Sequence, residues 1–423
     1  MRKLLLAATA ITAAATMTHG AAAQTAGPKA PFIAVLDGSA VSTFGVQSGT
    51  QNNNHGREVG MRQDADMRFK FEAKADNGLI YGWYVRIEGE SSAITVDSRS
   101  VNREWIYLVH PTLGGIQLGT ANNPVTSTFG GACGSMVPAN YGPCGAPNQF
   151  GPDGDLEAKH ITDPNALAID GALARTGASN LRIGQGTKIR YDSPKIAGFV
   201  LRLAYQPDGR QRNEEQFVTD TQGAAAISSS ADEGGGFLGK FQNMVDASLT
   251  YTGAFGPVAN MTGIDFTHAD SKDFTFGTAV AKPINATLVG TQFAYAGWTW
   301  GIAYNWVGQS GYSNTVSQAS GASPVKSWGW STSIEYDIGP WQMGAWYQYA
   351  RSQGAFTTNG LIDLNYFGIG GGYTVAPGLK LIGEGFLYDD HNTHLTVAQA
   401  AVLPGHPRNP HGQIYLAGVD LEW

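Results

Sequence analysis

The sequence predicts an all-β protein, a sixteen-stranded antiparallel β-barrel that spans a membrane. Three observations lead to this fold class: segments in which apolar and polar side chains alternate, an even number of such segments, and connections that alternate between short turns and long loops. The composition agrees, because only 14% of residues are charged, 56 are Gly, and no apolar stretch reaches the roughly 20 residues that a membrane-spanning helix needs.

Turn residues divide the chain into sixteen expected strands. These lie at residues 32–47, 63–75, 79–90, 101–110, 115–120, 186–192, 198–206, 243–253, 257–267, 287–296, 298–308, 327–338, 341–350, 362–375, 379–389 and 411–423. Short turns such as Asp76-Asn77-Gly78 join strands in pairs, and long polar loops separate the pairs. In outer-membrane barrels the short turns are periplasmic and the long loops extracellular, so the pattern favours that architecture over a soluble sandwich.

The first hairpin shows the alternation on which the strands are assigned. From Met67 to Lys74, apolar residues occupy odd positions and charged residues even positions, and the strand from Leu79 to Ile87 repeats this pattern after the turn. Sixteen strands enclose a lumen too wide for side chains to fill. We therefore expect the charged positions to face water inside the barrel and the apolar positions to face lipid.

Aromatic residues lie near the ends of the expected strands. Examples are Tyr81, Trp83, Tyr191, Trp298, Trp300, Trp328, Trp330, Trp341, Tyr373 and Trp423. Aromatic rings concentrate at the two membrane–water interfaces. A soluble sandwich core would explain the number of aromatic residues but not these terminal positions.

The N-terminus resembles a secretory signal peptide. Arg2 and Lys3 precede an apolar run from Leu4 to Ala15 and the small residues Ala21 to Ala23, so we expect cleavage before Gln24. The chain would then consist of a signal peptide at 1–23 and a barrel domain at 24–423. The formal net charge of −7 argues against nucleic acid as a partner.

Three segments resemble the Gram-negative general porins, a family of trimeric sixteen-stranded barrels. They are residues 103–119, the hairpin from Lys188 to Tyr205, and the C-terminal strand. In the last, Tyr415, Val419, Leu421 and Trp423 match the assembly signal of outer-membrane proteins, although the usual final residue is Phe. The resemblance implies location in the outer membrane of a Gram-negative bacterium, a homotrimer surrounded by outer-membrane lipid, and recognition by the outer-membrane insertion machinery.

The function implied by the resemblance is passive diffusion of small hydrophilic solutes and ions. A channel selective for a sugar, phosphate or another nutrient is the main alternative, and a barrel-based enzyme or adhesin is another. The sequence contains no Gly-x-Ser-x-Gly, His-Glu-x-x-His or Walker-type motif, and the stretch from Asp389 to His394 lacks the spacing of a known metal site. We therefore predict no catalytic residues, no cofactor and no metal.

The longest connection, residues 121–185, is the candidate constriction. In the family resembled, this third loop folds into the channel and narrows it. Its acidic residues are Asp153, Asp155, Glu157, Asp163 and Asp170. A solvated external loop would also explain these acids. The loop contains Cys133 and Cys144, which an oxidising compartment would allow to form a disulfide.

Basic residues on the polar face of the strands are expected to line the pore opposite this loop. They include Arg68, Lys70, Arg86, Arg103, Lys188 and Arg190. Opposite charges across a narrow aqueous gap would create a transverse field. For any one of these residues taken alone, simple hydration of the wall is the preferred interpretation.

Overall fold

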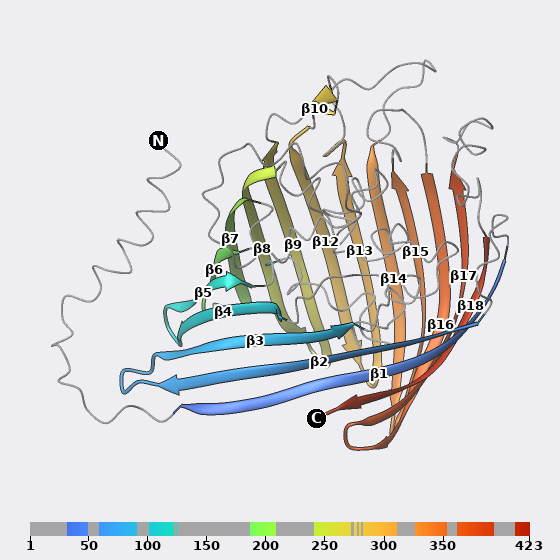
Figure 1. Cartoon of the computed structure of the whole chain (residues 1–423), viewed down its shortest axis with the longest axis horizontal. Helices are drawn as coiled ribbons and strands as arrows, with labels where there is room; N and C mark the ends of the chain where they lie inside the picture. Colours follow the sequence, from blue (N-terminus) through green and yellow to red (C-terminus); the bar gives the residue numbers. More distant parts are fainter. Residues whose placement is uncertain are drawn as a thin grey trace.

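The computed structural model describes residues 32–49, 59–90, 101–121, 124, 187–208, 241–271, 275–276, 279–280, 282–310, 326–352, 362–392 and 411–423. Sixteen of the strands in these ranges close into an antiparallel barrel, in which strands that follow one another along the wall are neighbours in sequence (Figure 1). No helix in the described ranges is long and apolar enough to cross a membrane. The predicted all-β barrel of sixteen antiparallel strands is therefore confirmed.

The barrel strands correspond one to one with the predicted strands, and their end points differ by a few residues. They are β1 (Ile33–Gly49), β2 (Val59–Lys74), β3 (Ile80–Glu90), β4 (Val101–His110), β5 (Gly114–Thr120), β6 (Lys188–Asp192), β7 (Phe199–Asp208), β8 (Phe241–Phe255), β9 (Val258–Ser271), β12 (Ile284–Tyr295), β13 (Trp298–Gly308), β14 (Ser327–Ile338), β15 (Trp341–Ser352), β16 (Ile362–Ala376), β17 (Leu379–Asn392) and β18 (His411–Glu422). A separate two-stranded sheet of β10 (Thr275–Phe276) and β11 (Ala279–Val280) lies beyond one rim (Figure 1).

The first and last strands close the barrel. β1 pairs with β18 from Ser39 opposite Glu422 to Gly49 opposite Gly412. Beyond this ladder, Gly38 and Trp423 exchange two backbone hydrogen bonds, each 3.1 Å between nitrogen and oxygen. The last residue of the chain therefore contributes directly to the closure.

Short turns lie on one rim, as the sequence predicts. In the β2–β3 turn, Gly78 has φ +88°, a conformation that favours Gly, and its amide donates to the carbonyl of Ala75 at 2.9 Å. The side chain of Asn77 accepts a hydrogen bond from the amide of Leu79 at 3.0 Å. Glycine at the left-handed position and an Asn side-chain cap explain why these residues make a tight hairpin.

The two faces of the wall differ in chemistry. On β9, exposed Ile264 and Phe266 alternate with buried Asp265 and Thr267, which face the barrel interior. This alternation follows the expectation that apolar side chains face outward and charged side chains inward.

The inner face of β12 to β18 is more apolar than the sequence predicts. Ile284, Leu288, Trp346, Tyr366 and Ile414 face inward and are almost fully buried. Trp346 does so because its partner on β16 is Gly368, which leaves room for the indole to lie flat against the wall. Its Nε1 donates to Glu384 on β17 at 3.0 Å, across the intervening strand.

Aromatic side chains form pairs near both ends of the outer surface. Near the short turns, Trp298 stacks on Tyr336 with ring centroids 4.5 Å apart. Toward the other rim, Trp328 packs against Tyr349 at 5.1 Å. Two aromatic levels on one surface are the arrangement expected at the two membrane interfaces.

Candidate functional site: the charged inner wall

Three arginines form one row across neighbouring strands. Arg68 on β2 lies directly opposite Arg86 on β3, and Arg86 lies opposite Arg103 on β4. All three share the inward-facing side of their strands. Directly opposed like charges destabilise a sheet, so such a row needs acidic partners.

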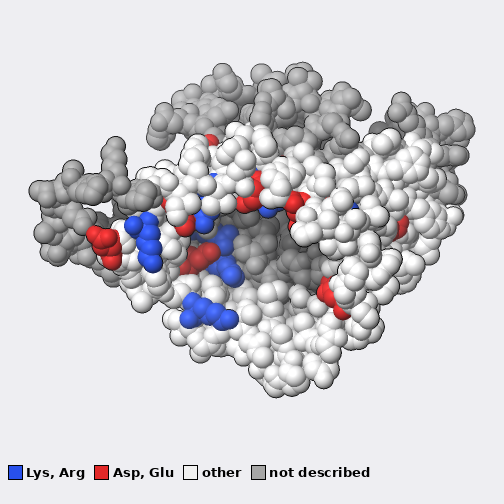
Figure 2. Space-filling view, turned by 90° about the horizontal axis from the view of Figure 1, so that it is seen from below, with Lys and Arg blue, Asp and Glu red and all other residues white. Residues whose placement is uncertain are grey.

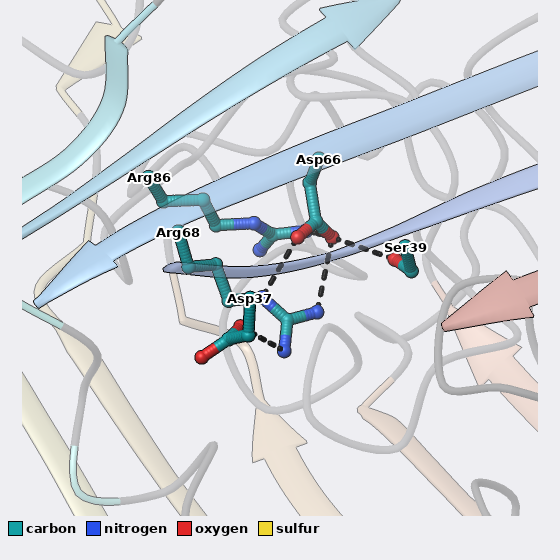
Figure 3. Close-up of polar contacts among 5 residues, drawn as sticks. All are labelled: Asp37, Ser39, Asp66, Arg68 and Arg86. Carbon is teal, nitrogen blue, oxygen red and sulfur yellow. Dashed lines mark hydrogen bonds and ion pairs between the residues drawn. The ribbon is translucent and has the colours of Figure 1, made fainter. Parts of the chain in front are cut away.

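Asp66 supplies the main partner. Its Oδ1 lies 2.7 Å from Arg68 Nε, and its Oδ2 lies 2.9 Å from Arg86 Nη2 (Figure 3). Ser39 on β1 donates to the same carboxylate at 3.2 Å, and Asp66 is only 2% exposed. Charge-assisted bonds to two guanidinium groups fix both side chains against the wall.

A second acid, Asp37 on β1, lies 3.5 Å from Arg68 Nη1. The cluster of Asp37, Asp66, Arg68, Arg86 and Arg103 therefore contains three cations and two anions. Its excess charge is positive. Because the cluster faces a lumen with low-dielectric walls, its field extends further than it would in bulk water.

An aromatic pair adjoins the row. Tyr84 on β3 and Trp105 on β4 are stacked with centroids 4.0 Å apart, two positions along their strands from Arg86 and Arg103. The two rings contact each other face to face beside the guanidinium groups. The sequence did not reveal this pair, because a role was predicted only for the aromatic residues near strand ends.

Lys70 is largely neutralised by its neighbours. Its Nζ lies 2.7 Å from Glu72 and 5.8 Å from the centre of the Tyr107 ring. The Tyr107 hydroxyl donates to the same Glu72 at 2.8 Å, passing over Gly82 on β3. Lys70 therefore adds less to the field than its charge suggests.

Lys188 and Arg190 belong to a second group on β6 to β9. Arg190 forms a two-point contact with Asp192, at 2.7 and 2.8 Å, and Lys188 donates to the carbonyl of Ala121 at 2.9 Å. Arg202, on β7, donates to Thr250 at 2.9 Å and lies 3.9 Å from Asp192. This group is balanced by acids on its own strands, including buried Asp246 and Asp265.

The predicted basic wall thus divides into unequal parts. All six predicted basic residues lie on inward-facing positions, but the structure brings only Arg68, Arg86 and Arg103 into one row. Lys and Arg side chains gather beside Asp and Glu on one side of the hollow in the molecule (Figure 2). Asp66 could have been found from the sequence, because it shares the parity of Arg68.

Several predicted residues lie outside the described ranges. These are the loop acids Asp153, Asp155, Glu157, Asp163 and Asp170, the cysteines Cys133 and Cys144, and the signal peptide at 1–23. Among the residues that the structure describes, no group of three or more His, Cys, Asp or Glu side chains could hold a metal ion.

The four residues of the predicted assembly signal lie on the outer face of the last strand. Tyr415, Val419, Leu421 and Trp423 are 54%, 37%, 44% and 55% exposed. Trp423 also packs against Gly38, where a Cβ would meet the indole ring. An apolar outward face agrees with their predicted pattern, and their recognition by another protein remains a prediction.

A family profile described as Gram-negative porin matches residues 7–394. Similar solved structures include OmpT of Vibrio cholerae in a trimer form, with a TM-score of 0.56, 12% identity, and coverage of 93% of this chain and 99% of that chain. The anion-selective porin from Comamonas acidovorans has a TM-score of 0.56 and 10% identity, covering 93% and 100%.

OmpF of Salmonella typhi, solved in a complex with daunomycin, gives a TM-score of 0.56 and 11% identity, covering 92% of this chain and 97% of that chain. At such identities the three structures support the fold alone. No curated protein sequence matches the chain.

Proposed function

Because this chain belongs to the Gram-negative porin family, we propose that the arginine row on its inner wall biases which solutes cross the pore. The protein is an outer-membrane pore for passive diffusion of small hydrophilic solutes and ions, located in the outer membrane of a Gram-negative bacterium. The observation that carries the proposal is the register that places Arg68, Arg86 and Arg103 side by side.

The row acts as the positive pole of the lumen. Cationic side chains lining a pore favour anions through their electrostatic attraction. Asp66 and Asp37 hold the guanidinium groups of Arg68 and Arg86 in place, and the two acids are fewer than the three arginines of the row. Solutes with a carboxylate or phosphate are therefore expected to pass this wall more readily than cations of equal size.

The loop at 121–185 is the proposed negative pole and constriction. Its length and acidic residues support this role, together with the resemblance of the chain to porins. Neutralising Asp153, Asp155 and Glu157 together would then raise the preference for anions. A disulfide between Cys133 and Cys144 would stiffen the loop.

The remaining properties concern the protein in its membrane. The proposed mature chain begins at Gln24, forms a homotrimer in outer-membrane lipid, is inserted by the machinery that reads Trp423, and is not an enzyme. Family membership and the outward apolar face of β18 support this proposal.

Swelling of liposomes that contain the purified protein tests passive diffusion against selective transport. Neutral sugars of increasing size should enter at rates that fall smoothly with size and rise linearly with concentration. A rate that saturates for one sugar, while others of equal size enter slowly, would instead indicate a selective channel.

A further inference from the structure

Two cations on the outer surface lie over aromatic rings, and both are near the extracellular rim. Lys326, which directly precedes β14, has its Nζ 5.6 Å from the centre of the Trp306 ring. Arg351 on β15 has its guanidinium carbon 5.9 Å from the centre of the Trp328 ring. Trp306 lies directly opposite Trp328, which lies opposite Arg351, so these side chains form one array across β13, β14 and β15.

The position of this array along the strands determines how deep it lies in the membrane. Arg351 follows Trp341, the first residue of β15 on the short-turn rim, by ten positions. With a rise of about 3.3 Å per residue and a tilt of about 40°, ten residues climb about 25 Å, which is the height of the apolar band of such barrels. The array therefore lies where the hydrocarbon of the outer leaflet meets its headgroups.

The aromatic and charged parts of the array match the two sides of that boundary. Trp306 and Tyr304 are 39% and 42% exposed on the outer face, and they adjoin the Trp328 and Tyr349 rings. Lys326 lies two positions beyond Trp328 toward the extracellular rim, and Arg351 lies two positions beyond Tyr349. Long cationic side chains in this position direct their charge toward the headgroups while their stems cover apolar surface.

Arg351 is held in a fixed orientation. Its Nε and Nη2 donate to Asp363 on β16 at 2.7 and 3.2 Å, and the Tyr349 hydroxyl donates to the same carboxylate at 2.7 Å. Among the described residues, no acid lies within ion-pair distance of Lys326. Two cations against one acid leave the array with a positive excess.

We propose that this array, formed by Lys326, Arg351, Trp306 and Trp328, binds the anionic phosphate of a lipid headgroup in the outer leaflet. Lys326 provides ammonium donors and Arg351 provides an oriented guanidinium, while the indole rings contact the adjoining acyl chains. On the same strands, the aromatic residues near the short turns include Trp298, Tyr336 and Trp341, and no described cation lies over their rings. The site is therefore specific to one leaflet.

Native mass spectrometry of the detergent-purified oligomer tests the proposal. Dioleoylphosphatidylglycerol, which carries a net negative charge, is the probe, and zwitterionic dioleoylphosphatidylcholine is the comparison lipid. The wild type should retain phosphatidylglycerol in preference. Lys326→Gln should weaken its retention about fivefold, since a cation near a membrane surface contributes about that factor.

Arg351 requires a paired change, because removing it alone would leave Asp363 without its cation. The variant Arg351→Gln/Asp363→Asn keeps hydrogen-bonding groups in both positions and should also weaken retention. Lys195→Gln, at an exposed turn on the opposite rim, is the matched control and should bind as the wild type. Heat-modifiable migration verifies that each variant is folded.

Four outcomes would overturn the proposal. One is equal retention of the two lipids by the wild type, and another is undiminished retention by folded Lys326→Gln. The third is displacement of the lipid by millimolar inorganic phosphate, which would indicate a site for free phosphate. Loss of the oligomer in folded Lys326→Gln would assign this face to a second copy of the chain, and would likewise overturn it. Conductance is a separate measurement, so failure here leaves the pore function intact.

Discussion

Asp66 is the residue on which the geometry of the charged wall depends most. It contacts Arg68, Arg86 and Ser39, and these contacts join β1, β2 and β3 on the inner face. A buried carboxylate between two guanidinium groups screens their mutual repulsion. The wall therefore keeps an ordered cluster with a positive excess where three arginines alone would repel each other.

We expect Asp66→Asn to change selectivity and stability together. Removing one negative charge should raise the permeability of anions relative to cations, because the cluster gains positive excess. The loss of the charge-assisted bonds to Arg68 and Arg86 should lower stability by about 1–3 kcal/mol, seen as a lower temperature of heat modification. Asp337→Asn, at the exposed end of β14, is the control; an Asp66→Asn variant that matches it in both measurements would refute this role.

Gly368 is the residue that allows Trp346 to lie flat against the wall. A Cβ at this position would overlap the indole, so Gly368→Val should displace Trp346 from Glu384 into the lumen. We expect reduced single-channel conductance and a lower temperature of heat modification. Gly383→Ala on β17 is the matched control, because its nearest atom would be the Leu416 carbonyl oxygen at an ordinary 3.8 Å. Wild-type conductance in Gly368→Val would contradict the account.

At the scale of elements, alternation of side chains was sufficient to predict the strands. In a strand that faces lipid on one side and water on the other, apolar and polar side chains alternate along consecutive residues. β2 and β3 can therefore be recognised without knowing which strands they pair with. The short β10 and β11 were not predicted, because a strand of two residues is too short to show an alternation of apolar and polar side chains. The inward-facing apolar side chains of β12 to β18 were not predicted either; the placement of Trp346, for example, depends on Gly368 in the neighbouring strand.

The charged site was predicted only in part for the same reason. Inward-facing Arg68, Arg86 and Arg103 follow from parity within each strand. Their alignment in one row requires the register between strands, which long loops such as 91–100 do not encode locally. The contact of Asp66 with Arg86 depends on that register. Its contact with Arg68 does not, because Arg68 is on the same strand and only two residues away in the sequence.

The end of β18 gives a prediction at this scale. Deleting Trp423 would remove both backbone hydrogen bonds with Gly38 and leave the start of β1 without a partner there. We expect the deletion to lower the amount of folded protein in the outer membrane, and Trp423→Phe to restore it because the backbone bonds and an aromatic ring remain. Quantitative immunoblotting of outer-membrane fractions measures both; wild-type amounts after the deletion would contradict this role.

For the whole molecule, the strand order and the alternation of faces describe a closed wall with an apolar outside and a charged region inside. The charge is unevenly distributed around the lumen. The arginine row lies on β2 to β4, whereas the inner face of β12 to β18 carries many apolar side chains. A solute crossing the pore therefore meets a field directed across its path as well as a restriction of size.

The central claim is that the arginine row lines the conducting path and favours anions. The most direct test is the reversal potential of single channels in a KCl gradient, compared between wild type and the triple variant Arg68→Gln/Arg86→Gln/Arg103→Gln, with Lys195→Gln as control. We predict that the triple variant shifts the reversal potential toward cation preference. The shift should shrink as salt rises from about 0.1 M to about 1 M, because the Debye length falls from about 10 Å to about 3 Å. An unchanged reversal potential in a folded, conducting triple variant would show that the row does not control the ions that pass.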